Sequence, residues 1–216
     1  MDITITAGYE GILNDRQIAY LAKYHDFIDP FIPENMKETT GYFKTEEETK
    51  FKQVTALSYG LGSFGYDFRL SPELYLKVNQ TGEVINVKDF NIEEHFEPME
   101  IQRDEYGKYA ILPPHSFVLG QSIEYVKMPD DVVAVCFDKS TYARVGGVQT
   151  NVTPLEPGWE GTITLEIRNT LPDYTRLYVN EGLIQAVFFK GLKPGINYRN
   201  KGGKYQGQNK PTGPKM

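Results

Sequence analysis

Cysteine is nearly absent from the sequence. The chain of 216 residues contains one, Cys136, in the apolar run DVVAVCF. One cysteine cannot form a disulfide within its own chain, so we expect a protein of a reducing compartment and a cytoplasmic location. The expected role of Cys136 is that of a small buried core residue.

Long apolar runs and an excess of basic residues are also missing. No run of about eighteen apolar residues occurs, so no transmembrane helix is expected. The start MDITITAGYEG lacks the basic and apolar regions of a signal peptide, so none is expected. Lys and Arg number 23 against 29 Asp and Glu, which gives a formal net charge of −6. Duplex binding needs clustered cations, so we expect neither a nucleic-acid partner nor a membrane partner.

Strand-forming segments are abundant. The chain holds 15 Tyr and 12 Phe, residue types that favour strands and interfaces. From residue 57 onward, short strand-like segments follow one another between turn residues, namely YDFRLSPELYLKV, ILPPHSFVLGQSIEYVKMP, DDVVAVCFDKS, GTITLEIRN, TRLYVNEG and LIQAVFFKG. We expect DDVVAVCFDKS to be a buried strand. This pattern predicts a mainly β sandwich or barrel with little helix.

One helix is expected near the N-terminus, in ILNDRQIAYLAKY. Asn14 can cap it, Gln17 follows three residues later, and an apolar stripe contains Ile18, Leu21 and Ala22.

The remaining segments are polar, and they complete the predicted organisation. Residues 26–56 are polar and charged, and we expect a loop or insertion at 33–50. Residues 193–216 are rich in Gly, Lys, Gln and Pro, which predicts a mobile tail. The sequence thus indicates a single domain over 1–216, with the helix and insertion at about 12–56 and a β core at about 57–192.

One carboxylate stands inside the strand-like segment TITLEIRN. Alternation along a strand directs Ile163, Leu165 and Ile167 to one face. Glu166 then lies on the opposite, polar face. An ordinary strand glutamate there would pair with Arg168 or with a cross-strand cation.

Two neighbouring segments favour a functional role for this carboxylate. PLEPGWEG places two prolines and two glycines before the strand, which predicts a sharply shaped turn. KSTYARVGG supplies Ser140, Thr141 and Arg144 before a glycine pair. Hydroxyls, an arginine and glycine backbone can form a phosphate cradle, although the same residues also describe an ordinary polar loop with turn-capping hydroxyls.

Five motifs, in order, resemble those of the dCTP deaminase family, which belongs to the trimeric dUTPase-like superfamily. They are SYGLGSFGYDFRLS, KSTYARVG, NVTPLEPGWEGTITLEIRNT, NEGLIQAVFF and GGKYQGQ. The resemblance covers roughly residues 57 to 213. It implies a dUTPase-like distorted β-barrel, or β-clip, that assembles as a homotrimer with its sites at subunit contacts.

The resemblance also implies an activity, the hydrolysis of dCTP to dUTP and ammonia without zinc. Zinc deaminases need His/Cys-x-Glu and Pro-Cys-x-x-Cys motifs. This chain has one cysteine and three scattered histidines, His25, His95 and His115, so we expect no zinc site and no protein-held metal. Mg²⁺ is expected to arrive on the triphosphate of the nucleotide. The expected ligands are dCTP, the product dUTP, and dTTP as an inhibitor.

Residue roles follow from the same resemblance. Glu166 activates the water, while Arg144 and Ser140 complete the catalytic group. Glu156 stands where the family commonly has Asp and would bind the 3′-hydroxyl with an arm one methylene longer. The implied substrate-binding residues are Lys139, Ser140, Thr141, Tyr142, Ala143, Arg144, Glu156, Thr164, Leu165, Glu166, Gln185, Tyr198, Lys204 and Gln208.

Other side chains near these motifs carry structural expectations. For Asp67 and Arg69 we expect structural roles, with an Asp67–Arg144 pair or an intersubunit pair as open alternatives. Core packing is expected for Trp159.

Alternatives to a deaminase that stops at dUTP remain open. A bifunctional enzyme would carry dCTP through to dUMP, and a dUTP diphosphatase would attack the α-phosphorus with an activated water. The third alternative is a non-catalytic trimer that binds nucleotides.

Overall fold

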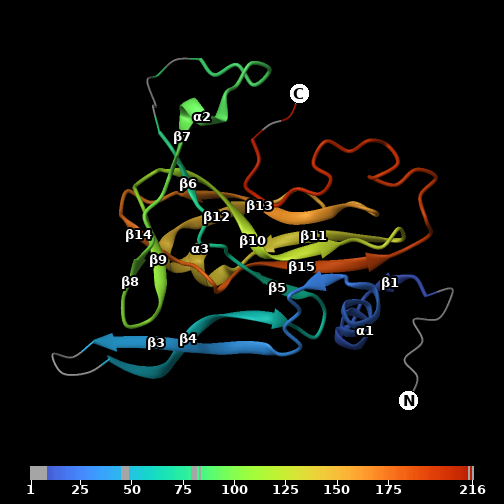
Figure 1. The fold of residues 1–216 in the computed structure, drawn as a ribbon, viewed down its shortest axis with the longest axis horizontal. Coiled ribbons are helices and arrows are strands. Elements are labelled where there is room, and N and C mark those ends of the chain that lie inside the picture. Colours follow the sequence, from blue (N-terminus) through green and yellow to red (C-terminus); the bar gives the residue numbers. More distant parts are fainter. Residues whose placement is uncertain (1–8, 45–48, 79–81, 83, 214, 216) are drawn as a thin grey trace.

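The protein is built mainly from antiparallel strands, as Figure 1 shows. The structure is a computed structural model that describes residues 9–44, 49–78, 82, 84–213 and 215. Within the described residues, the chain forms two six-stranded sheets and one three-stranded sheet. The predicted mainly β fold class is confirmed.

Two larger sheets make up the core. The first contains, in spatial order, β1 (Gly11–Ile12), β15 (Gly182–Lys190), β5 (Tyr66–Arg69), β4 (Thr49–Leu61) and β3 (Asn35–Lys44), with β11 (Val132–Asp138) also paired to β15. The second contains β12 (Val148–Asn151), β13 (Glu160–Asn169), β10 (Phe117–Lys127), β6 (Tyr75–Lys77) and β7 (Phe96–Pro98), with β2 (Ile28–Asp29) also paired to β10. The small third sheet contains β14 (Thr175–Tyr178), β9 (Lys108–Leu112) and β8 (Gln102–Arg103).

Burial alternates along β13 as the sequence predicted. Ile163, Leu165 and Ile167 are at most 1% exposed, and they pack in one core with aromatic residues such as Phe68 and Phe188 from the first sheet. Alternate side chains of a strand point to opposite faces. The face that carries Glu166 is therefore turned away from this core.

The N-terminal helix α1 (Asp15–His25) forms where it was predicted. The Asn14 side chain accepts from the Gln17 backbone N–H, and the Gln17 side chain accepts from the Asn14 backbone N–H, which completes a capping box. Ile18 and Leu21 are buried against the sheet. The helix thus seals one end of the core, beside β1 and β5 in Figure 1.

The prediction of a loop at residues 33–50 is wrong for residues 35–44 and 49–50, while residues 45–48 lie outside the described part of the chain. β3 and β4 pair from Asn35↔Gly60 to Lys44↔Thr49 and form a long ribbon, drawn along the lower left of Figure 1. The ribbon carries polar residues on both strands, so the apolar alternation that marks a strand is confined to Val54 and Ala56. A Cβ on Gly41 would lie 2.3 Å from the backbone O of Glu105, so the ribbon packs closely on residues 104–106.

The structure also contains two short helices that the sequence did not predict, one of them in a segment with the composition of a polar loop. α3 (Ser140–Gly146) occupies KSTYARVG and ends at Gly147, whose φ is +60°. α2 (Ile92–His95) lies in an excursion between β6 and β7 that stands above the sheets in Figure 1. Both helices are shorter than two full turns. They are therefore too short to show the apolar periodicity by which a helix is predicted from sequence.

The strand β11 is only half buried, contrary to the prediction of a buried strand. Val132 and Ala134 face the core, whereas Phe137 is 54% exposed. Cys136 is partly buried against the core, and burial raises the pKa of its thiol to about 12. The thiol is therefore protonated and unreactive near neutral pH. None of the helices in the described part of the chain is long and apolar enough to cross a membrane.

Candidate functional site

A cavity of about 890 Å³ opens on the polar face of β13. Its walls come from β13 and β10, the turn between β12 and β13, the α2 excursion and the C-terminal tail. The residues on these walls that the sequence had singled out are Glu156, Trp159, Thr164, Glu166, Arg168, Tyr198 and Gln208. The structure thus brings five of the predicted substrate-binding residues to one cavity.

Glu166 is half-buried on this wall, opposite Leu119 of β10 and Asn151 of β12. The amide Nδ2 of Asn151 donates to Glu166 Oε2 at 2.8 Å. Arg168 lies instead over the ring of Phe117, with 5.6 Å from its Cζ to the ring centroid. The carboxylate therefore has a neutral amide as its cross-strand partner, whereas an ordinary strand glutamate would be expected to have a cation.

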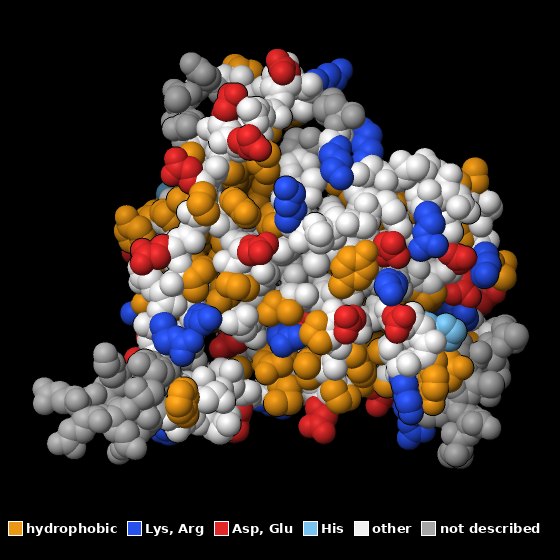
Figure 2. All heavy atoms as spheres, in the orientation of Figure 1, with side chains coloured by type: hydrophobic (Ala, Val, Ile, Leu, Met, Phe, Trp, Pro, Cys, Tyr) orange, Lys and Arg blue, Asp and Glu red, His pale blue; other side chains and the backbone are white. Residues whose placement is uncertain are grey.

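An apolar wall borders the carboxylate on its β10 side. Leu119 and Phe117 of β10 line the cavity together with Phe96 of β7 and Phe90 from the excursion. The rings of Phe96 and Phe117 meet edge to face at 6.1 Å between centroids. Figure 2 shows apolar side chains gathered below the segment that carries α2. This wall limits the access of water to one side of Glu166, and the sequence had not predicted it.

The C-terminal tail forms the opposite wall. Gln208 Nε2 donates to the Thr162 backbone O at 2.8 Å and to Thr164 Oγ1 at 3.0 Å. The Gly207 and Thr162 backbone N–H groups add further bonds between the tail and β13, to Glu160 O and Gln208 O. The tail expected to be mobile is therefore fastened along the edge of the strand that carries Glu166.

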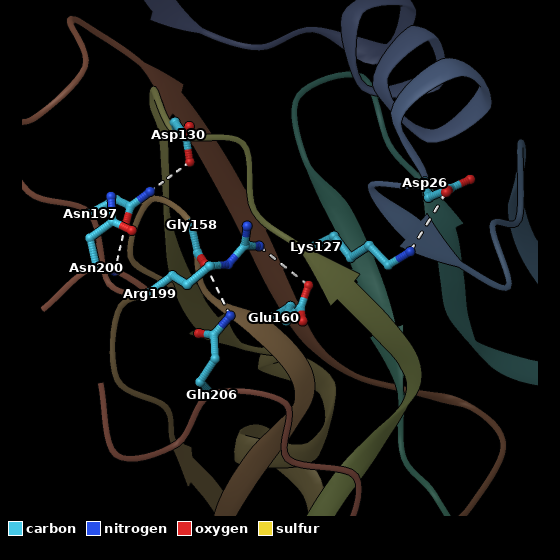
Figure 3. A network of polar contacts seen from close by, with 9 residues as sticks. All are labelled: Asp26, Lys127, Asp130, Gly158, Glu160, Asn197, Arg199, Asn200 and Gln206. Atoms are coloured by element: carbon cyan, nitrogen blue, oxygen red, sulfur yellow. Dashed lines mark hydrogen bonds and ion pairs between the residues drawn. The ribbon is translucent and has the colours of Figure 1, made fainter. Parts of the chain in front are cut away.

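Hydrogen bonds and an ion pair from Trp159 and several polar side chains also hold the tail against the rest of the chain. Trp159 is 6% exposed, and its Nε1 donates to the Tyr205 backbone O at 3.1 Å. Figure 3 shows three further contacts, in which Asn197 donates to Asp130, Arg199 lies beside Glu160, and Gln206 donates to the Gly158 backbone O. Trp159 therefore packs as predicted and also lines the cavity.

Lys201 contacts two residues of the cavity wall, Glu156 and Tyr198. The Glu156 carboxylate accepts from Lys201 Nζ, and the same ammonium lies 5.2 Å from the centroid of the Tyr198 ring. Lys204 is exposed on the tail and is not among the cavity residues. The ammonium is thus held beside two residues of the cavity wall, where it can meet an anionic ligand.

The residues of α3 lie outside this cavity. Ser140, Thr141, Ala143 and Arg144 are exposed on the helix surface. Tyr142 is buried, and its hydroxyl accepts from the Tyr178 backbone N–H at 2.8 Å. Thr141 and Tyr142 line a second cavity of about 360 Å³ beside Glu181. Within this single chain, the two halves of the predicted site are therefore separate.

Lys139, which precedes α3, is committed to a buried ion pair. Its ammonium donates to Asp67 Oδ2 and to Ser58 Oγ, the latter at 2.9 Å. The side chains of Lys139 and Asp67 are 13% and 4% exposed. The partner of Asp67 is thus Lys139 and not Arg144, so the suggested Asp67–Arg144 pair is wrong. The pair anchors the start of α3 to β5.

Another partly buried cation, Arg69, pairs across the core. Its Nε lies 2.6 Å from Glu124 Oε1, and the Arg69 backbone N–H donates to Glu124 Oε2 at 3.0 Å. Burial raises the pKa of Glu124, while the charge and hydrogen bonds of Arg69 lower it. This geometry supports the predicted structural role of Arg69.

Two further predicted substrate-binding residues, Gln185 and Leu165, are not among the cavity residues. Gln185 is half-buried on β15, opposite Asp67 of β5. The Leu165 side chain is fully buried in the core, so only its main chain is available to a ligand. Their roles in substrate binding stay predictions.

The sequence does not mark Asn151 as a partner of Glu166. An exposed asparagine near a turn is common, and only the register of β12 on β13 brings it opposite Glu166. The strand register is a property of the folded hairpin, and a single sequence does not reveal it. Among the described residues, no group of three or more His, Cys, Asp or Glu side chains is placed to hold a metal ion.

The sheets and the cavity define a mainly β protein with a carboxylate in a ligand-sized pocket. The family described as dCTP deaminase-like matches residues 12–191. A dCTP deaminase of Erythrobacter litoralis is 39% identical over 206 residues, which cover 95% of this chain and 99% of that protein. A dCTP deaminase of Paracidovorax citrulli is 40% identical over 205 residues, covering 94% of this chain and 98% of that protein. The chain belongs to the dCTP deaminase-like family.

A solved structure shows that the fold is shared with more distant relatives. The crystal structure of 2′-deoxycytidine 5′-triphosphate deaminase from Agrobacterium tumefaciens matches with a TM-score of 0.52 at 17% sequence identity. The match covers 84% of this chain and 49% of that chain, so this chain spans about half of its length.

Proposed function

We propose that this chain hydrolyses the exocyclic amine of dCTP and releases dUTP and ammonia. The observation that carries the proposal is the half-buried Glu166 on the wall of a nucleotide-sized cavity, in a chain whose relatives are dCTP deaminases. The amine is exchanged for oxygen without any change in oxidation state. Water therefore supplies the oxygen, and a single acid–base group can serve the whole reaction.

Glu166 moves the protons in this mechanism. Its carboxylate takes a proton from water while the water oxygen bonds to C4 of the cytosine. The proton passes to N3, and a tetrahedral centre forms at C4. Glu166 then transfers the remaining hydroxyl proton to the amine, the C4–N bond breaks, and ammonia leaves as the C4 carbonyl forms. Well-placed acid–base help is typically worth on the order of 10²–10⁴ in rate.

The substrate would lie between the tail and the turn before β13. Glu156 would bind the 3′-hydroxyl, while Tyr198, Lys204 and Gln208 would close over the triphosphate. Mg²⁺ would enter as part of the substrate, bound to the phosphates. dTTP would compete for the same cavity as an inhibitor. The docked tail supports this arrangement, because Gln208 already contacts Thr164 beside Glu166.

Ser140 and Arg144 would reach the cavity from a neighbouring chain of a homotrimer. Both are exposed on α3, and no residue of α3 is among the cavity residues of this chain. Exposed hydroxyl and guanidinium groups on a short helix suit a contact made across subunits. The arginine would orient Glu166 and the serine would order the water. The single cysteine and the intracellular nature of the substrate support a cytoplasmic location.

The activity test is product analysis with dCTP, CTP, dCMP and dUTP side by side. We expect ammonia and dUTP from dCTP. Pyrophosphate and dUMP appearing with the ammonia would show the bifunctional enzyme, and pyrophosphate from dUTP alone would show a dUTP diphosphatase. Binding of dCTP without any change in its ultraviolet spectrum would contradict catalysis altogether.

Replacing Glu166 with glutamine tests the assigned base. The amide keeps the size of the side chain but cannot accept the proton of water, so we expect dCTP to bind while ammonia release falls by at least 10²-fold. Glu97→Gln is the control, because Glu97 is an exposed strand glutamate that is not among the cavity residues. Unchanged turnover by Glu166→Gln would refute the assignment.

A further inference from the structure

Asn151 is placed to control the orientation of the Glu166 carboxylate. It is the last residue of β12 and lies directly opposite Glu166 in the antiparallel ladder. Its Nδ2 lies 2.8 Å from Glu166 Oε2, within the ordinary range of an N–H···O bond. Asn151 is not among the residues that line the cavity, so it holds the carboxylate from the strand side.

The position of Asn151 is itself fixed by the backbone. The ladder between β12 and β13 runs from Val148↔Asn169 to Asn151↔Glu166 without a register shift. One residue earlier, the Thr150 backbone N–H donates to Asp138 Oδ1 at 3.0 Å, which ties β12 to the end of β11. The amide thus projects from a strand held on two sides, as a positioning group requires.

The chemistry of an acid–base glutamate explains why a neutral amide suits this position. One carboxylate oxygen must face the reacting water and the cytosine ring. The other oxygen must be held in place, so that the carboxylate cannot rotate away from them. An amide N–H holds that second oxygen without adding charge. A carboxylate directly opposite would instead repel Glu166, since like charges across a ladder are destabilising.

We propose that Asn151 is a positioning residue that fixes Glu166 Oε2 and so directs the other oxygen toward the reacting water. The inference rests on the proposed function, because it assigns Asn151 to the same proton transfers. Asn151 touches neither the water nor the nucleotide in this role, and its effect on the reaction passes through Glu166.

Kinetics of Asn151→Ala with dCTP test the inference. Loss of the amide frees the carboxylate to rotate, and we expect kcat to fall by about 10- to 100-fold while KM stays within about threefold. Asn151→Gln retains the donor on a longer arm and should recover part of the loss. Asn151→Asp places a charge opposite Glu166 and should be slower than Asn151→Ala at neutral pH.

A matched control separates positioning from stabilisation of the hairpin. Gln149 carries the same functional group two residues earlier on β12, on the same face; it lies opposite Arg168 and not Glu166, and it is not itself among the cavity residues. Gln149→Ala should keep the wild-type kcat. An equal loss of kcat in both alanine variants, a rise in KM without a fall in kcat, or wild-type kcat in Asn151→Ala would each overturn the inference.

The parent protein distinguishes failure of the inference from failure of the proposed function. If the unsubstituted chain releases ammonia from dCTP and Asn151→Ala matches it, only the role of Asn151 is refuted. If the unsubstituted chain binds dCTP but releases no ammonia, the proposed function falls, and the role of Asn151 falls with it.

Discussion

Among single residues, Glu181 does not behave as a surface acid. It is 5% exposed, and its Oε2 accepts from the Leu57 backbone N–H at 2.7 Å. Burial raises the pKa of Glu181 to about 7, and the nearby charge of Asp104 adds to this, while the Leu57 bond opposes it. A carboxyl that titrates near neutral pH in the folded chain makes stability depend on pH.

The free energy of unfolding should carry a signature of Glu181. Its folded pKa lies above the ordinary value of 4.5, so the folded state holds the proton more tightly than the unfolded state. This contribution to stability is complete below the unfolded pKa and is lost as pH rises through about 7. Urea unfolding at pH 5 and pH 8, at fixed protein concentration, should show a loss on the order of 2 kcal/mol relative to Glu181→Gln. Parallel pH dependence in the two proteins would contradict this.

Single residues also mark how far the sequence could be interpreted. The Asn14–Gln17 capping box and the buried face of β13 were predictable because both depend on short, local spacing. The pairing of Lys139 with Asp67 was not, because the two residues are 72 positions apart and only the meeting of α3 with β5 brings them together. The same holds for Asn151, whose importance depends on strand register.

At the scale of elements, the tail and the β3–β4 ribbon show where composition misleads. Gly, Lys, Gln and Pro predict a solvated tail, yet its main chain pairs with β13, including the parallel bridge Gly161↔Gln208. Backbone hydrogen bonding is open to any sequence, so composition cannot reveal it. The ribbon is similar, since its polar residues form strands through the ladder of Asn35–Lys44 with Thr49–Leu61.

Removal of the tail should be visible through Trp159, the single tryptophan of the chain. Trp159 is buried, and its indole N–H donates to the Tyr205 backbone O. A chain that ends at Gly195 loses that partner and exposes the ring. We expect a red shift of its fluorescence emission and stronger quenching by acrylamide. Tyr205→Phe keeps the backbone acceptor and should leave the emission unchanged. An unshifted spectrum in the truncated chain would show that the tail does not cover the indole.

For the whole molecule, the decisive feature is the separation of α3 from the Glu166 cavity. The fold class and the order of the motifs were predictable from the sequence, because strands and turns carry strong local signals. The assembly of the site was not, because it depends on how the surfaces of complete chains meet. The exposed Arg144 and the cavity bearing Glu166 are the two surfaces in question.

Mixing two inactive variants tests whether complete sites form between chains. Glu166→Gln and Arg144→Gln are refolded together, so that the proposed homotrimers contain both chains. A site that takes Glu166 from one chain and Arg144 from its neighbour is then intact in about one quarter of cases, and we expect about that fraction of the parent activity. Glu166→Gln mixed with Glu166→Ala serves as the control and should stay inactive. Mixed trimers without recovered activity would show that one chain supplies both groups.

The attachment of residues 207–208 to β13 couples the position of the tail to the surroundings of Glu166. The strand that bears Glu166 also provides the hydrogen bonds that hold the tail in place. Release of those bonds would remove one wall of the cavity and bring more solvent to Glu166. A change in how the tail docks is therefore also a change in the surroundings of the carboxylate.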